Sequence, residues 1–163
     1  MASDHVTPER SFGSVVAAGL DRSGALVLDL VDHRERTGWM VDRAVELARH
    51  GPCAFVVDPG GPAGSLIPAL EARGLEVTKP SAGDVARAAG AFVDAVTERT
   101  VRHRGQVPLT AAAAGARARP LADAYAFARK GTTVCIAPLV GASLAMWGHA
   151  VKAGRVPSLY VAS

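Results

Sequence analysis

The sequence has few cysteines, and they are not arranged as a site. Cys53 and Cys135 are the only two among 163 residues, and neither belongs to a Cys-x-x-Cys pair or to a cysteine and histidine cluster. A disulfide framework and a structural zinc site are therefore not expected. This cysteine usage fits a reducing, cytoplasmic location.

Long apolar runs are also missing, and the first residues do not resemble a signal peptide. No stretch of eighteen or more apolar residues is present, and residues 1–5 have neither the basic start nor the apolar centre of a signal peptide. We therefore expect a soluble intracellular protein with no membrane partner. Repeats and linkers are absent, so we expect one domain over residues 1–154 and a loose tail over residues 155–163.

Charge is sparse and mildly positive. Only 20% of the residues are charged, and the formal net charge is +3. Binding to a polyanion is therefore expected only where basic residues cluster. The 49% of hydrophobic residues are enough to build a real core.

One apolar run ends abruptly in a carboxylate. Residues 53–57 read as a buried strand, Asp58 follows, and residues 59–64 are rich in Gly and Pro. Asp58 is thus predicted at the carboxyl end of a central strand, where open α/β sheets place their ligands. Asp58 could equally cap the following turn or helix, and its position leaves both roles open.

Alternating apolar periods predict an α/β fold. Strands over residues 13–19 and 25–31 should form a hairpin, and Ser81 with Asp84 resembles a capping box for a helix that ends near Arg99. The other elements are expected at these places: a helix from Thr37 to about His50, a helix over 63–73, a strand over 75–78, a helix over 109–117, a strand over 125–128, a short β-branched segment over 132–136 and a helix over 139–153. Residues 159–161 could pair as an edge strand. The expected architecture is a mixed sheet with helices on both faces.

Several short segments together resemble a known family. They read VTPERS at 6–11, TGW at 37–39, VDPGGP at 57–62, RHRGQ at 102–106, AGARARPLADAYAFAR at 114–129 and PLVGASLAMWGH at 138–149. In this order and spacing they resemble the C-terminal nuclease domain of actinobacteriophage terminase large subunits, and the resemblance covers most of the chain.

The resemblance implies a fold, a reaction and partners. The fold would be RNase H-like, with aspartates that hold two Mg²⁺ or Mn²⁺ ions and cut double-stranded DNA during genome packaging. The partners would be the terminase ATPase domain, the small terminase and the portal, in the cytoplasm of a phage-infected or prophage-carrying bacterial host.

The acids that the family uses are incomplete here. Asp58 matches one family acid, but His5 stands where the family has an Asp at the end of its first strand, and Cys135 stands where it has a third. Hard divalent ions prefer carboxylate oxygen, so imidazole and thiol are poor replacements. Asp4 could replace His5 only if a bulge restores its direction. Asp123 could also serve, since it stands just before the strand at Tyr125, although a turn or helix-end residue after Pro120 is the simpler interpretation. His5 and Cys135 could favour a softer metal, although a surface His and a buried structural Cys are the simpler interpretation.

Basic residues suggest where DNA could pass. They are Arg102, His103 and Arg104, expected on one loop, and Arg117, Arg119, Arg129 and Lys130. Positive side chains beside an acidic site suit backbone binding, and solvated surface charge is the alternative. Because no GxGxxG or GxxxxGK[ST] pattern is present, nucleotide binding is rejected. Two hypotheses remain: a metal-dependent DNA endonuclease, or a degenerate nuclease fold that binds DNA or packaging partners without cutting.

Overall fold

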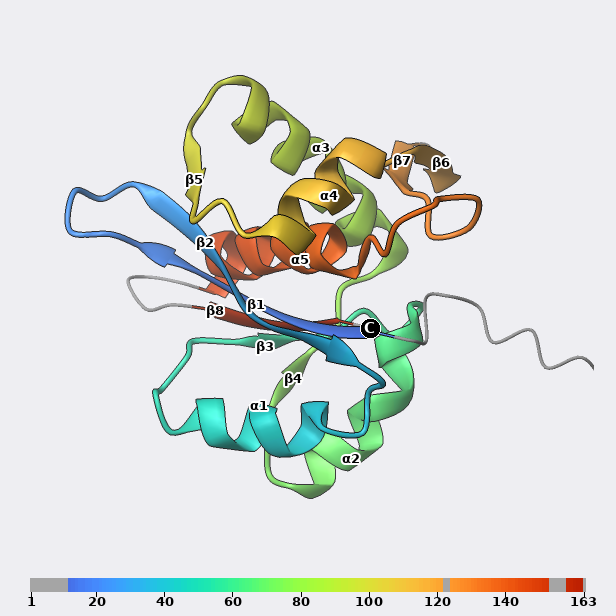
Figure 1. Cartoon of the computed structure of the whole chain (residues 1–163). Helices are drawn as coiled ribbons and strands as arrows, with labels where there is room; N and C mark the ends of the chain where they lie inside the picture. The colour runs from blue at the N-terminus through green and yellow to red at the C-terminus, as the bar shows by residue number, and fades with distance from the viewer. Residues whose placement is uncertain (1–11, 122–123, 153–157, 163) are drawn as a thin grey trace, which may run out of the picture.

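The computed structural model describes residues 12–121, 124–152 and 158–162 as a mixed sheet between two layers of helices (Figure 1). The strands are β1 (Phe12–Leu20), β2 (Leu26–Glu35), β3 (Phe55–Val56), β4 (Val77–Thr78), β5 (Val101–His103), β6 (Ala118–Leu121), β7 (Ala124–Phe127) and β8 (Ser158–Ala162). The helices are α1 (Met40–Ala48), the 3₁₀ helix η2 (Pro62–Leu66), α2 (Ile67–Ala72), α3 (Ala82–Thr97), α4 (Val107–Gly115) and α5 (Ala137–Lys152).

The main sheet has six strands in the order β4-β3-β8-β1-β2-β5. β1 runs antiparallel to β2 and β8, whereas β3 runs parallel to β4 and β8, and β5 parallel to β2. The expected α/β mixed sheet is therefore confirmed. β6 and β7 pair separately as a small antiparallel sheet.

The β1–β2 hairpin forms where the sequence predicted it. Its turn is organised by Asp21, whose Oδ1 accepts hydrogen bonds from the backbone N–H groups of Ser23 and Ala25 at 2.8 and 3.0 Å. Gly24 has a φ of 82°, which a residue without Cβ adopts without steric cost.

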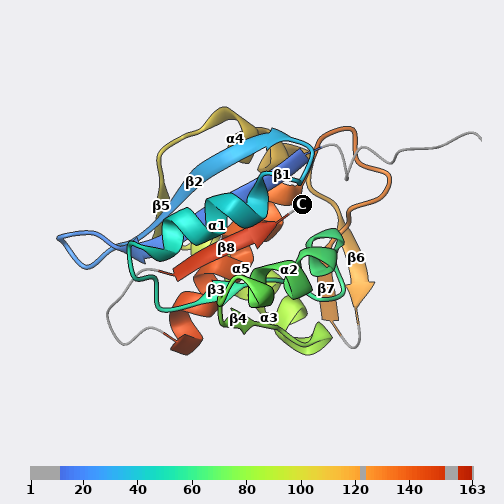
Figure 2. The same ribbon diagram turned by 90° about the horizontal axis from the view of Figure 1, so that it is seen from below.

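The strand β8 lies inside the sheet, between β1 and β3 (Figure 2). Tyr160 is in register with Val16 on one side and with Val56 on the other. Residues 158–162 are therefore neither a loose tail nor the expected edge strand. Their pairing partners lie more than a hundred residues away in the chain, so no local pattern signals this position.

Two apolar cores cover the two faces of the sheet. On one face α1 and α2 pack through Met40, Ala44 and Leu70, and on the other α3, α4 and α5 surround a larger core (Figure 1). α5 is buried along most of its length and contacts β1, β8 and α3, so it is the central helix of this layer. Helices on both faces were predicted and are confirmed.

Several local expectations need correction. Thr37 does not cap α1 with its hydroxyl; the helix begins at Met40, whose N–H donates to the Thr37 carbonyl oxygen at 3.0 Å. The segment expected as one helix over 63–73 is a 3₁₀ turn followed by a short α-helix, with Pro68 near the junction. The β-branched segment 132–136 forms no strand. The capping box at Ser81 and Asp84 is confirmed, since each side chain bonds the other's backbone N–H.

Within the part of the chain that the structure describes, no helix has both the length and the hydropathy needed to cross a lipid bilayer.

Candidate functional site

Asp58 lies where the sequence predicted it, directly beyond the carboxyl end of β3. The preceding Val57 still pairs with the sheet, because its N–H donates to the Thr78 carbonyl oxygen at 3.0 Å. Asp58 itself is 9% exposed and accepts a hydrogen bond at Oδ1 from the Gly60 N–H at 2.9 Å. One carboxylate oxygen therefore has the turn-capping role that the sequence left open.

The other carboxylate oxygen of Asp58 faces an arginine. A Cβ placed on Gly61 would lie 3.0 Å from Asp58 Oδ2 and 3.0 Å from Arg129 Nη2. Only a residue without a side chain leaves room for both groups here. The carboxylate and the guanidinium thus face the same small space above the Gly60-Gly61 turn.

A cavity of about 10 Å³, enough for roughly one water molecule, opens beside Asp58. Arg119 reaches it from β6, Arg129 from the segment after β7, and Ser143 from α5. The Ser143 hydroxyl donates to the Val140 carbonyl oxygen at 2.9 Å, so it is already engaged within its helix. The described lining of this small cavity therefore combines one carboxylate with two arginine side chains.

Of the other candidate positions for site acids, the structure describes only Cys135. Cys135 is half-buried in the segment that leads into α5, the helix that brings Val140 and Ser143 to the Asp58 cavity, but Cys135 does not line that cavity. Asp4, His5 and Asp123 lie outside the described residues.

The described residues do not by themselves fit a two-metal site. Across 12–121, 124–152 and 158–162, no three His, Cys, Asp or Glu side chains come together as a metal-binding group. The Asp58 cavity has no second carboxylate among its described lining, and its two arginines would repel a cation. Two Mg²⁺ or Mn²⁺ ions held close together need several anionic ligands.

Arg102 and His103 lie on a strand, not on the expected loop, and Arg104 follows it. β5 pairs with β2, and the Gln106 side chain extends this contact: its Nε2 donates to the Leu30 carbonyl at 3.0 Å, and its Oε1 accepts from the Leu30 N–H at 3.2 Å. The two arginines are exposed and paired with acids, Arg102 with Asp21 at 3.2 Å and Arg104 with Asp29 at 3.4 Å. Their positive charge is therefore partly neutralised.

The pairing of Arg102 belongs to a larger set of contacts at the β1–β2 turn. Hydrogen bonds from the Ser23 hydroxyl and the Ala25 N–H lower the pKa of Asp21, and the charge of Arg102 acts in the same direction. Asp21 thus stays ionised to a lower pH than an ordinary aspartate and remains a partner for Arg102.

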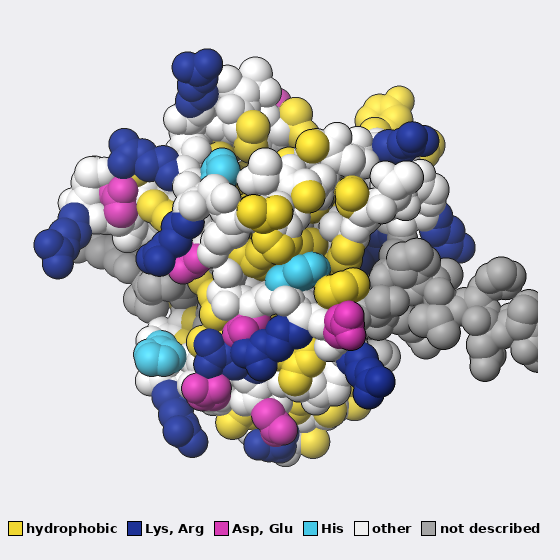
Figure 3. Space-filling model, in the orientation of Figure 1, with side chains coloured by type: hydrophobic (Ala, Val, Ile, Leu, Met, Phe, Trp, Pro, Cys, Tyr) yellow, Lys and Arg dark blue, Asp and Glu magenta, His cyan; other side chains and the backbone are white. Residues whose placement is uncertain are grey.

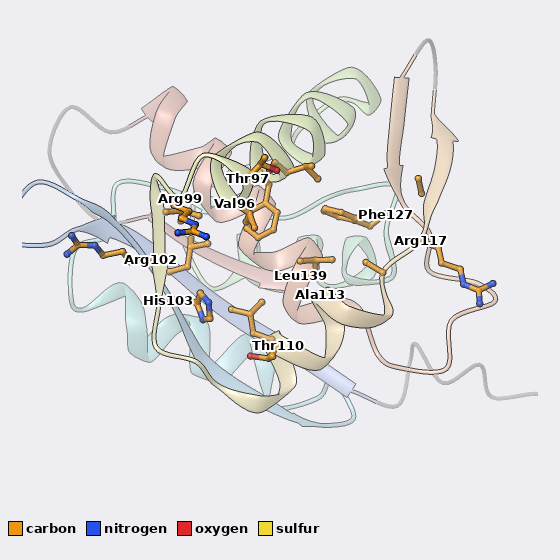
Figure 4. A pocket seen from close by; sticks show the side chains of 17 residues that line it. Val96, Thr97, Arg99, Arg102, His103, Thr110, Ala113, Arg117, Phe127 and Leu139 are labelled. Carbon is orange, nitrogen blue, oxygen red and sulfur yellow. The ribbon is translucent and has the colours of Figure 1, made fainter.

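The predicted basic set is divided between two places. Arg119 and Arg129 belong to the Asp58 cavity, and the exposed Lys130 follows Arg129. Arg102, His103 and Arg117 instead line a second, much larger cavity of about 640 Å³ (Figure 4). Phe127 contributes to the walls of both cavities and stands between them.

The larger cavity is a feature that the sequence analysis missed. Its walls come from α3, β5, α4 and the residues around β7. Leu109 and Ala113 share one face of α4, and Ala116 follows the end of the helix; the i, i+4 spacing of the first two could have drawn attention to this helix. The alanine-rich composition of α4 indicated only helix propensity.

Comparisons of the chain with protein-family models, with curated proteins and with solved structures found no match.

Proposed function

We propose that this chain is a nuclease-type domain of a phage terminase large subunit and acts on the DNA backbone at Asp58. The observation that supports this most is the position of Asp58, nine-tenths buried at the carboxyl end of β3, with two arginines beside it. The motifs at 57–62, 114–129 and 138–149, on which the family resemblance depends, contribute Asp58, Arg119, Arg129 and Ser143 to this one cavity.

The arginines have a direct role in this proposal. Guanidinium groups recognise phosphate with paired hydrogen bonds, and the exposed Lys130 adds a point charge to the same surface. Arg119 and Arg129 would hold a phosphate near Asp58, whereas Arg102 and Arg104 contribute less because Asp21 and Asp29 offset them. A divalent ion, Mg²⁺ or Mn²⁺, would supply Lewis-acid chemistry to a complete site of this family.

A second candidate function is DNA binding without cleavage. It is favoured by the composition of the Asp58 cavity, in which the described residues place two cations and one carboxylate. In either case we propose the packaging machinery as the context: double-stranded DNA, the terminase ATPase domain, the small terminase and the portal, in the bacterial cytoplasm.

The cleavage test is a supercoiled-plasmid nicking assay with Mg²⁺. We expect little or no nicking by the unmodified chain, because His5 and Cys135 replace two family acids. The double change His5→Asp with Cys135→Asp should restore nicking, and adding Asp58→Asn should abolish it again. Strong nicking by the unmodified chain that is lost with Asp4→Asn would contradict this account and make Asp4 the missing ligand.

The binding test measures the affinity for duplex DNA as a function of salt. Binding to phosphates releases counterions, so the affinity should fall steeply with salt, and Arg119→Ala with Lys130→Ala should reduce the logarithmic slope by about 2. Arg49→Ala is the matched control, since this exposed arginine follows α1 on the opposite face of the sheet. If the control variant weakens binding as much as the double variant, Asp58 and its arginines are not the DNA-binding surface.

A further inference from the structure

The larger cavity has the walls of a ligand site and no role in the proposed action on DNA. It measures about 640 Å³, within the range of roughly 300–1,000 Å³ that small-molecule sites occupy. Its floor reaches core residues that are almost fully buried, namely Leu28, Leu109 and Leu139. Because the cavity is open at one side and reaches these apolar residues, it can hold a narrow apolar group such as an alkyl chain.

The two threonine hydroxyls in the walls already donate hydrogen bonds. The Thr97 hydroxyl donates to the Val93 carbonyl oxygen at 2.8 Å, and the Thr110 hydroxyl donates to the Gln106 carbonyl oxygen at 3.2 Å, both within their own helices. A nucleobase or sugar held among the apolar walls and these two engaged hydroxyls would lose more hydrogen bonds to water than it gained. The walls therefore favour a hydrocarbon.

The charge at the mouth has one sign. Arg99 and His103 lie at the β5 end of the cavity, and Phe127 and Leu139 lie toward its other end (Figure 4). No Asp or Glu lines the cavity, and no described carboxylate lies within ion-pair distance of Arg99. In Figure 3 the hydrophobic side chains gather over the region of α4, with Lys or Arg side chains at the margin of this area.

His103 is prepared to donate a hydrogen bond. Its Nδ1 accepts from the Gly105 N–H at 3.0 Å, which places the ring proton of the neutral form on Nε2. The Nε2–H of His103 and the guanidinium of Arg99, which both line the cavity, can each donate to a carboxylate oxygen.

Arg99 also has an unusual backbone. It has a φ of 58° directly after the C-terminus of α3, a position that glycine occupies most readily. The folded protein is therefore less stable with arginine at this position than it would be with glycine.

From these features we propose that the cavity binds a monomeric anionic amphiphile of the long-chain carboxylate class. The alkyl chain lies between α3 and α4 toward Phe127 and Leu139, and the carboxylate lies at Arg99 and His103. A partner helix would remain at the rim and leave the deep floor unfilled, which is why a single alkyl chain is the better occupant.

The test is displacement of 1-anilinonaphthalene-8-sulfonate from the folded chain, followed by fluorescence below the micelle concentration of each competitor. Dodecanoate should displace the probe at least tenfold more effectively than dodecanol or dodecyltrimethylammonium, because only the carboxylate pairs with Arg99. Equal displacement by all three, or carboxylate binding only when it is presented in anionic phospholipid vesicles, would overturn the proposal.

Matched variants locate the site. Ala113→Trp, which fills the cavity from α4, should reduce dodecanoate affinity at least tenfold, whereas Ala114→Trp, outside the lining, should not. Arg99→Gly should raise the melting temperature and still weaken dodecanoate binding about tenfold, while dodecanol binding stays unchanged.

If Ala113→Trp does not fold, the second variant is Val96→Asp, at a half-exposed residue of the cavity mouth. This variant should weaken the binding of dodecanoate. Wild-type affinity in Arg99→Gly and in the folded cavity variants would refute the proposal.

Discussion

His33 is the histidine whose surroundings are best defined. Its ring stacks on Phe12 with the ring centroids 5.0 Å apart, and its Nδ1 lies 2.7 Å from Oγ of the fully buried Ser14. Burial lowers the pKa of His33 below its ordinary value of 6.5. The folded protein therefore favours the neutral ring, which can share one proton with the Ser14 hydroxyl.

The lowered pKa makes stability depend on pH in one direction. As the pH falls through 6.5, the unfolded chain takes up a proton at His33 before the folded chain does, so the free energy of unfolding should decrease from about pH 8 to about pH 5. Urea unfolding at both pH values measures this change. His33→Gln should flatten the dependence, and the exposed His50→Gln should leave it intact; an unchanged slope in His33→Gln would rule His33 out as its source.

Two glycines in helices have opposite surroundings. Gly90 lies in α3, and a Cβ there meets nothing within 4 Å, whereas a Cβ on Gly64 in η2 would lie 2.4 Å from the Pro59 carbonyl oxygen. Gly64 thus lets the 3₁₀ turn pack directly onto the backbone that follows Asp58. Its small size helps to define the shape of the candidate site.

Alanine at these two positions should change stability in opposite directions. Gly90→Ala should raise the free energy of unfolding by about 0.5–1 kcal/mol, because alanine is the better helix former and has room. Gly64→Ala should lower it, because the backbone of Pro59 must move. Thermal unfolding of both variants tests this, and a stabilised Gly64→Ala would show that the turn is not as tightly packed as described.

The elements that the sequence predicted are those with local signals. The β1–β2 hairpin has a Gly-containing turn between two apolar runs, and α3 has its own capping box at Ser81. β5 and β6 were missed, since they are only three and four residues long and have no alternating apolar pattern. Their pairing depends on partners elsewhere in the chain, such as β2 for β5.

The candidate site was predictable to a similar extent. Asp58 could be placed because the end of an apolar run and a Gly/Pro turn are both visible in sequence. The division of the basic residues between two cavities could not be predicted, because it depends on how β6 and β7 pack against α3. Arg117 precedes β6 and Arg119 lies within it, and the two arginines line different cavities.

At the scale of the whole molecule, β8 joins the two halves of the sheet. Without it, β1 and β3 would have no common neighbour. Tyr160→Pro should therefore lower the free energy of unfolding by about 1–3 kcal/mol, because proline lacks the N–H that a residue donates to a ladder and is poorly tolerated in a central strand. Chemical denaturation followed by circular dichroism measures the loss.

The control for this change is Ala118→Pro in the separate two-stranded β6–β7 sheet, which already contains Pro120. Ala118→Pro should lower the free energy of unfolding by clearly less than Tyr160→Pro does, since proline is compatible with edge strands. Equal losses in the two variants would mean that β8 is not needed to hold the sheet together.

The central position of β8 also has a consequence for the order of folding. Ser14 is in register with Ala162, so almost the whole chain forms a loop that must close before this ladder can form. Loop closure of this size costs entropy before any pairing compensates it, and such long-range contacts slow folding. The β1–β2 hairpin can form early from local contacts, and the slot between β1 and β3 is filled late. During that interval two strand edges are open to pairing with another chain, so refolding should be most prone to aggregation at high protein concentration.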